Sequence, residues 1–143
     1  MTEKIHAFGI IPIQKRSGKV YVLVVKQVNG HYWGFPKGKP NIGEMPHETA
    51  TRELFEETGL EIKEMISGRL FPETYFFDHD GTQYEKEVVY FPALVSGDGQ
   101  VFHPEEIEET EWVALDGLED ALTYGPAKQI AKQFKSWMME IKL

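Results

Sequence analysis

Three glutamates are spaced so that a helix would bring them onto one face. Glu53, Glu56 and Glu57 stand at positions i, i+3 and i+4, which on a helix fall within an arc of roughly 100°. Like charges this close repel each other by about 0.2–0.5 kcal/mol per pair on an exposed helix. A sequence keeps such a face for one of two reasons: either the face is simply solvated, or a cation binds to it.

The residues around these glutamates indicate a loop, a helix and a cap in succession. Pro46 lies near the expected helix start, where its missing N–H costs no hydrogen bond. Gly59 lies where a left-handed C-terminal cap is expected. The spacing therefore predicts a helix over residues 46–58, with Ala50 and Leu54 on its core-facing side.

The segment from residue 38 to 60 resembles the Nudix box, whose pattern is Gly-x5-Glu-x7-Arg-Glu-U-x-Glu-Glu-x-Gly-U, with U a bulky aliphatic residue. Every specified position is matched; the matching residues are Gly38, Glu44, Arg52, Glu53, Leu54, Glu56, Glu57, Gly59 and Leu60. The chain is identified as a member of the Nudix family on this motif. The resemblance implies a Nudix-type α/β/α sandwich with a mixed β-sheet and a loop–helix–loop catalytic motif. It also implies hydrolysis of a nucleoside diphosphate linked to another group.

The family resemblance implies a role for each charged residue of the box. Glu53, Glu56 and Glu57 are expected to be catalytic and to hold Mg²⁺, for which Mn²⁺ can substitute. Arg52 is expected to pair with these carboxylates and orient them. Mg²⁺ prefers oxygen ligands, and phosphoryl transfer depends mainly on positioning and charge stabilisation. The chemistry therefore needs no side-chain nucleophile, and the chain contains no cysteine.

A further metal ligand is expected outside the box. Glu106, six residues before Trp112, matches an acidic position that ligates metal or assists the base in relatives. Because Glu105, Glu108 and Glu109 crowd it, a solvated acidic segment explains Glu106 equally well.

Segments flanking the box resemble the asymmetrical diadenosine tetraphosphate hydrolases, which cut the dinucleotide into ATP and AMP. The resemblance places four residues around the phosphates: His31, Lys37, Tyr75 and Lys86. It also places Tyr75 and Phe134 at positions that stack on an adenine, where aromatic side chains contribute about 1–3 kcal/mol per base. Lys39 stands where those enzymes often have histidine, which adds a cation beside the phosphates.

Two of these residues have an ordinary structural explanation as well. The spacing of Phe134 with Ile130 and Met138 is equally typical of a helix packed on the core. A lysine on a strand, such as Lys86, is usually just solvated. Lys86 alternates onto the same strand face as Tyr90, which favours the phosphate role.

Composition limits the remaining possibilities. The chain has 143 residues, which predicts one domain over residues 1–143, and no apolar run long enough to span a membrane. The absence of cysteine and of a signal-like start is typical of a soluble cytoplasmic protein. A net charge of −8 means that Mg²⁺ and local lysines must offset repulsion of a polyanionic substrate, and it argues against a DNA partner.

Hydrophobic patterns predict the other elements. Strands are expected at residues 5–13, 20–25, 84–95 and 112–115, with extended structure over 62–77 and helices at 117–122 and 126–141.

Two alternatives to a dinucleotide hydrolase remain open. An RNA 5′-pyrophosphohydrolase would carry a similar Trp-x-Phe-Pro-x-Gly segment before the box, and it would make an RNA 5′ end a partner. A nucleotide-sensing module that binds without cleaving would be free to lose box carboxylates, yet all of them are present.

Overall fold

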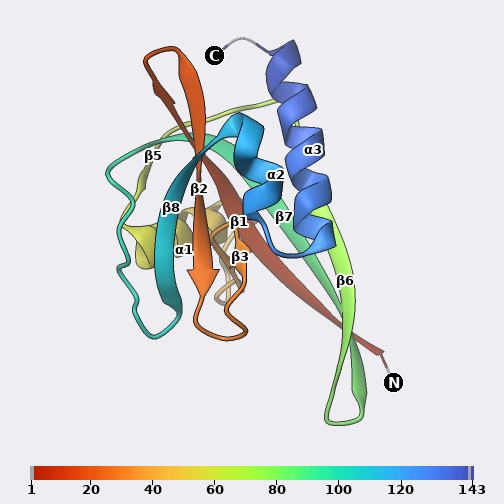
Figure 1. Ribbon diagram of the computed structural model, residues 1–143. Helices are drawn as coiled ribbons and strands as arrows, with labels where there is room; N and C mark the ends of the chain where they lie inside the picture. Colours follow the sequence, from red (N-terminus) through yellow and green to blue (C-terminus); the bar gives the residue numbers. More distant parts are fainter. Residues whose placement is uncertain (1, 142) are drawn as a thin grey trace.

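The computed structural model describes residues 2–141 and 143 and is built around one mixed β-sheet (Figure 1). Its strands are β1 (Thr2–Arg16), β2 (Lys19–Gln27), β3 (Trp33–Gly34), β4 (Lys37–Gly38), β5 (Glu61–Met65), β6 (Phe71–His79), β7 (Thr82–Ser96) and β8 (Ile107–Ala114). Five of them lie in the order β3-β2-β1-β7-β5, while β4 pairs with β1, β6 with β7 and β8 with β2. β1 and β7 run parallel, and the other pairs are antiparallel.

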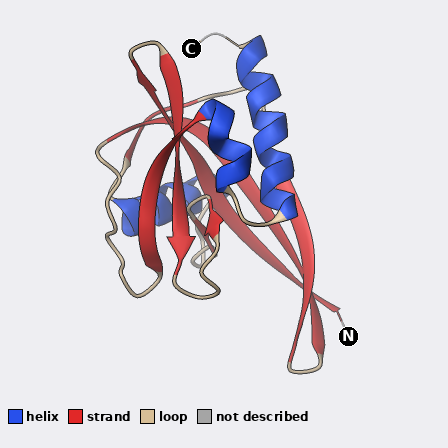
Figure 2. Cartoon of the chain, viewed as in Figure 1, coloured by secondary structure: helices blue, strands red, loops and turns tan. Residues whose placement is uncertain are grey.

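Helices cover both faces of the sheet. They are α1 (Pro46–Thr58), the 3₁₀ turn η1 (Leu115–Gly117), α2 (Leu118–Ala121) and α3 (Gly125–Glu140). Figure 2 shows α2 and α3 on one face and α1 behind the other. One apolar cluster includes Ile130 and Phe134 of α3, and a second includes Ala50 and Leu54 of α1. The predicted α/β/α sandwich is confirmed.

Most predicted elements are present, and the main error lies in β8. The helix predicted over 46–58 has those bounds. The last strand was expected only from Trp112, but it begins at Ile107 and pairs along β2. Its acidic residues Glu108, Glu109 and Glu111 are all exposed on an edge strand, where charged side chains are tolerated in solvent. The sequence pattern therefore resembled a charged loop.

In the β6–β7 hairpin, alternate residues of β6 present their side chains on the same face of the sheet. Glu73, Tyr75 and Phe77 occupy alternate positions of β6 and therefore share one side. Tyr75 lies directly opposite Lys86 of β7 in the antiparallel register.

No helix among the described residues is long and apolar enough to cross a membrane.

Candidate active site

Helix α1 is fixed at both ends by local hydrogen bonds. The backbone N–H of Met45 donates to the Glu48 carboxylate over 2.8 Å, which satisfies one of the free groups before the helix. At the other end Gly59 adopts φ 73°, and its N–H donates to the Phe55 carbonyl. A side chain at Gly59 would be strained and would also collide with the Phe102 ring. The carboxylates on this helix are therefore carried by a rigid element.

The glycine that opens the box makes room for a carboxylate. A Cβ at Gly38 would overlap the carboxyl group of Glu53. Gly38 lies on the short strand β4, which pairs with β1 beside α1. The absence of a side chain there lets Glu53 lie against the backbone.

Arg52 is the centre of a hydrogen-bonded network. Its Nε and Nη2 donate to the two oxygens of Glu44 over 2.7 and 3.0 Å. Its Nη1 donates to Glu53 over 2.8 Å and to Glu56 over 3.1 Å. Nη2 also donates to the Lys39 carbonyl over 2.9 Å. Arg52 thus joins the loop to the helix and fixes one oxygen of Glu53.

Glu44 is fully engaged by this network. Besides Arg52, it accepts hydrogen bonds from the Thr49 hydroxyl over 2.7 Å and from the Asn41 N–H over 3.0 Å. The Arg52 guanidinium, with Asn41 and Thr49, lowers the pKa of Glu44 to about 2. Such an acid stays ionised and serves as an anchor for the arginine.

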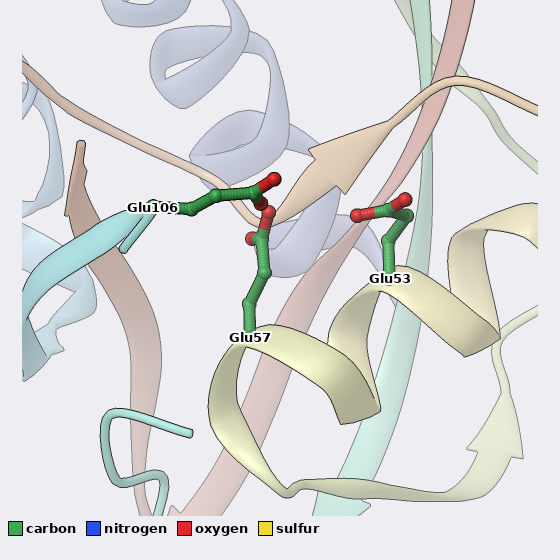
Figure 3. A group of neighbouring side chains, drawn as sticks. All are labelled: Glu53, Glu57 and Glu106. Atoms are coloured by element: carbon green, nitrogen blue, oxygen red, sulfur yellow. The ribbon is translucent and has the colours of Figure 1, made fainter. Parts of the chain in front are cut away.

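Three other carboxylates gather beside the helix. Glu53, Glu57 and Glu106 each offer an oxygen, and these atoms lie within 4.8 Å of one another. Figure 3 shows Glu53 and Glu57 rising from successive turns of α1, while Glu106 reaches across from the segment before β8 to the carboxylate of Glu57. The predicted grouping of Glu106 with box carboxylates is thus present in the structure. We call these three residues the carboxylate cluster.

Glu57 is the least satisfied member of the cluster. The residue is 2% exposed, and its Oε1 has no hydrogen-bond partner in the described part of the chain. Burial, with the charges of Glu53 and Glu106, raises the pKa of Glu57 to about 8, although Lys37 opposes the shift. Burial also raises the pKa of Glu53. A buried carboxylate without partners is costly.

A divalent cation would resolve this cost. Three convergent carboxylates, one of them buried with an orphaned oxygen, are a donor set that suits a hard ion with oxygen ligands. Glu56 is outside the group: it is half exposed and pairs with Arg52. Its role as a metal ligand stays a prediction.

An aromatic pocket of about 430 Å³ lies on the face of the sheet covered by α3. Its lining residues are Tyr32, Trp33, Gly34, Lys37, Glu73, Tyr75, Phe77, Tyr90, Tyr124, Gly125, Pro126 and Ala127. Tyr32 and Tyr124 pack at a centroid distance of 5.1 Å, although they are far apart in the sequence. The volume and the aromatic lining suit a flat organic ring.

Lysines border this pocket. Lys37 lines it, and its Nζ lies 3.4 Å from the Tyr32 hydroxyl. Lys86 lies 6.0 Å from the centre of the Tyr75 ring. Burial, together with the charges of Lys37 and Lys39, lowers the pKa of Lys86 to about 8. Three lysine charges therefore act on one small region, which suits a polyanion.

The structure separates two of the predicted substrate contacts from the pocket. Phe134 is fully buried and packs edge-on against Phe71 at 5.7 Å. The prediction that Phe134 stacks on a base is wrong, because its ring is part of the core. His31 is exposed, and its Nδ1 lies 3.1 Å from Glu108. Its contact with phosphate stays a prediction.

Sequence reasoning missed several pocket residues. Tyr124 lies in the segment before α3, where no periodicity marks it. Glu73 had a usable signal, because it alternates with Tyr75 on one strand face. Its Oε1 accepts a hydrogen bond from the Tyr90 hydroxyl over 3.3 Å.

Comparison with known proteins finds a family model that matches most of the chain and several proteins that are similar to it. The family model described as NUDIX domain matches residues 4–137. The mRNA-decapping enzyme subunit 2 of Arabidopsis thaliana is 30% identical over 132 residues, which cover 82% of this chain and 34% of that protein. The asymmetrical bis(5′-nucleosyl)-tetraphosphatase of Caenorhabditis elegans is 24% identical over 135 residues, 94% of this chain and 96% of that protein.

The fold is also similar to a solved structure. A binary complex of C. elegans Ap4A hydrolase superposes with a TM-score of 0.74 at 20% identity, covering 96% of this chain and 99% of that one. At this identity the likeness shows the architecture alone. This chain spans about a third of the decapping relative, so that longer protein's activity does not transfer to it directly.

Proposed function

Because this chain belongs to the Nudix family of hydrolases, we propose that it hydrolyses dinucleoside polyphosphates and cuts diadenosine tetraphosphate into ATP and AMP. The observation that carries the proposal is the position of Lys37. Its side chain lines the aromatic pocket, and its charge acts on Glu57 of the carboxylate cluster. A nucleotide with its base in the pocket would therefore have its phosphates beside the cluster.

The metal proposed for the site is Mg²⁺, held by Glu53, Glu57 and Glu106. When bound, such an ion neutralises charge on phosphate oxygens and favours ionisation of a nearby water.

The chain's own residues position the reactants. Lys37 and Lys86 offset the charge of the phosphates, and Tyr75 and Tyr124 offer ring faces to a base. Arg52 holds Glu53 through a 2.8 Å hydrogen bond, so the cluster is oriented before substrate arrives. Water attacks one phosphorus, a carboxylate accepts its proton, and the bond to the departing phosphate chain breaks.

A substrate panel tests this function. We expect Mg²⁺-dependent release of equal amounts of ATP and AMP from diadenosine tetraphosphate, read by chromatography. Reaction in ¹⁸O-water, followed by mass spectrometry, should label one product and thereby locate the attacked phosphorus. Turnover that persists in excess chelator would contradict the metal assignment, and an intact dinucleotide would contradict the substrate.

A second candidate function is hydrolysis at an RNA 5′ end, favoured by the 30% identity to the decapping enzyme. Nucleic-acid binding usually relies on a basic surface, and this chain carries a net charge of −8. A 5′-triphosphorylated RNA in the same panel separates the two functions, since a dinucleotide hydrolase would leave it intact.

A further inference from the structure

Strand β8 begins with an irregularity beside the carboxylate cluster. Lys26 of β2 lies opposite Glu109. The next residue of β2 lies opposite Ile107, so Glu108 has no residue opposite it. This arrangement is a β-bulge, a feature that redirects the chain and is frequent beside active sites. The bulge lies two residues after Glu106, which contributes a carboxylate to the cluster.

The bulge lets the start of β8 pack against the core beside helix α1. Ile107 is fully buried, in the same apolar cluster as Leu54 of α1. Glu109 is exposed, although regular alternation would put it on the same face as Ile107. Glu106 directly precedes Ile107, and its carbonyl accepts a hydrogen bond from the Val28 N–H over 2.8 Å. The position of Glu106 therefore depends on the shape of the bulge.

The side chain of Glu108 ties the bulge to β2 and to the turn that follows it. Glu108 Oε1 lies 3.1 Å from Nδ1 of His31, and Oε2 lies 3.2 Å from Nζ of Lys26. His31 lies in the turn after β2, which is closed by the Gln27 N–H donating to the Tyr32 carbonyl over 2.8 Å. Two basic side chains therefore hold the bulged residue in place.

Stability alone does not explain a histidine at position 31. Its φ of 51° lies in the left-handed region, which is uncommon for residues other than glycine. Asparagine tolerates this conformation and would serve the turn equally well. The ion pair with Glu108 lies at the surface, with 66% of the His31 side chain exposed, and such pairs contribute little to stability. What the imidazole adds at this position is its contact with the bulge.

We propose that Glu108 and His31 are positioning residues, which act through the bulge to hold Glu106 where its carboxylate meets that of Glu57 (Figure 3). The inference rests on the metal site of the proposed function. It goes beyond that function in assigning a role to two residues outside the carboxylate cluster, and the role it gives His31 differs from a phosphate contact.

Binding of Mn²⁺ alone, followed by the electron paramagnetic resonance signal of the free ion, tests the assignment without relying on turnover. We expect Glu108→Gln and His31→Asn each to weaken Mn²⁺ binding by about 3- to 10-fold, at or below the lower end of what outer partners of metal ligands contribute. His31→Asn should do so with no fall in Tm, because asparagine keeps the turn. Glu111→Gln, an exposed change of equal charge on the same strand, should leave the affinity unchanged.

A double substitution shows whether Glu108 acts through Glu106. Glu106→Gln should weaken Mn²⁺ binding by itself. Adding Glu108→Gln to that variant should cause no further loss, because two residues that act through one contact are not additive. A further loss as large as that of Glu108→Gln alone would indicate a general effect of charge and would overturn the positioning role.

The other outcomes separate this inference from the proposed function. If His31 contacts phosphate instead, His31→Asn raises the KM for the dinucleotide and leaves Mn²⁺ binding without nucleotide unchanged, which overturns its positioning role. Unchanged Mn²⁺ binding in Glu108→Gln overturns the role of Glu108 and leaves the metal site standing. Failure of the unaltered protein to bind Mn²⁺ overturns both. Weakened Mn²⁺ binding in the variants without dinucleotide hydrolysis by the unaltered protein would remove the proposed reaction and keep the positioning role.

Discussion

Glu44 and Glu57 stand at opposite ends of the same loop–helix unit, and their surroundings have opposite effects on them. Glu44 receives hydrogen bonds from Arg52, Thr49 and Asn41, and its pKa falls to about 2. Glu57 is buried beside other acids, keeps an oxygen without a partner among the described residues, and has its pKa raised to about 8. The first acid stabilises the fold by itself, whereas the second needs a cation. Replacing each by glutamine should therefore have opposite consequences.

The largest expected effect is on turnover. Glu57→Gln keeps the shape of the side chain but removes the charge that a divalent ion requires, and we expect kcat to fall by about 100-fold or more. Initial rates with saturating diadenosine tetraphosphate and Mg²⁺ measure the loss. Glu64→Gln, an exposed change on β5, serves as the control and should retain full activity. A nucleotide-sensing module would instead bind nucleotide without turnover before and after the change.

The same substitution should stabilise the metal-free protein at high pH. The pKa of Glu57 is about 8 in the folded chain and near 4.5 when unfolded, so the folded form holds its proton more tightly. The free energy of unfolding therefore decreases as pH rises from 4.5 to about 8. Since one pKa unit corresponds to about 1.4 kcal/mol, the decrease amounts to several kcal/mol. Glu57→Gln should remove this decrease.

Thermal melts in chelator at pH 5 and pH 9 measure this effect. Glu57→Gln should melt above the unaltered protein at pH 9, with a smaller gap at pH 5. Added Mg²⁺ should raise the Tm of the unaltered protein more than that of the variant, because a ligand stabilises the state it binds. A variant that melts lower at pH 9 would show that Glu57 is satisfied without metal.

Glu44→Gln should change stability in the opposite direction to Glu57→Gln, and by a smaller amount. The folded pKa of Glu44 lies below its unfolded value, so its contribution is present above pH 4.5 and lost as pH falls toward 2. We expect the variant to melt a few degrees lower at pH 7 and alike near pH 2, measured by circular dichroism. Equal melting at pH 7 would mean that Arg52 is held by Glu53 and Glu56 alone.

The contrast between these acids also marks the limit of sequence reasoning. The helix over 46–58 was predictable because Pro46 and Gly59 mark its ends and its buried apolar residues recur at helical spacing. Glu56 and Glu57 were indistinguishable by spacing, since both lie within roughly 60° of Glu53 on a helix, one on each side. Only packing decides that Glu57 is buried and that Glu56 turns to Arg52.

The aromatic pocket shows a second limit. Tyr32 and Tyr124 meet because a turn after β2 and the segment before α3 come together, and no local pattern records that contact. The prediction for Phe134 was wrong for a related reason. Helical spacing gives the same signal for an aromatic ring in the core and for one that binds a ligand, and Phe134 is buried. Tertiary packing therefore determines the pocket and brings Glu106 to the carboxylate cluster, whereas the local motif predicts only the helical members of that cluster, Glu53 and Glu57.

The smallest expected effect concerns Lys86, which lies beside Tyr75 at the border of the aromatic pocket. Lys86→Ala should raise the KM for the dinucleotide several-fold more than it lowers kcat, because the lysine charge is present in ground and transition states alike. Its pKa of about 8 adds a pH test: KM should rise between pH 7 and pH 9 as the folded lysine loses its proton, and the variant should lack that rise. Lys63→Ala, an exposed lysine on β5, is the matched control. An unchanged KM in Lys86→Ala would separate the lysine from the phosphates and leave Lys37 as the link between the pocket and the carboxylate cluster.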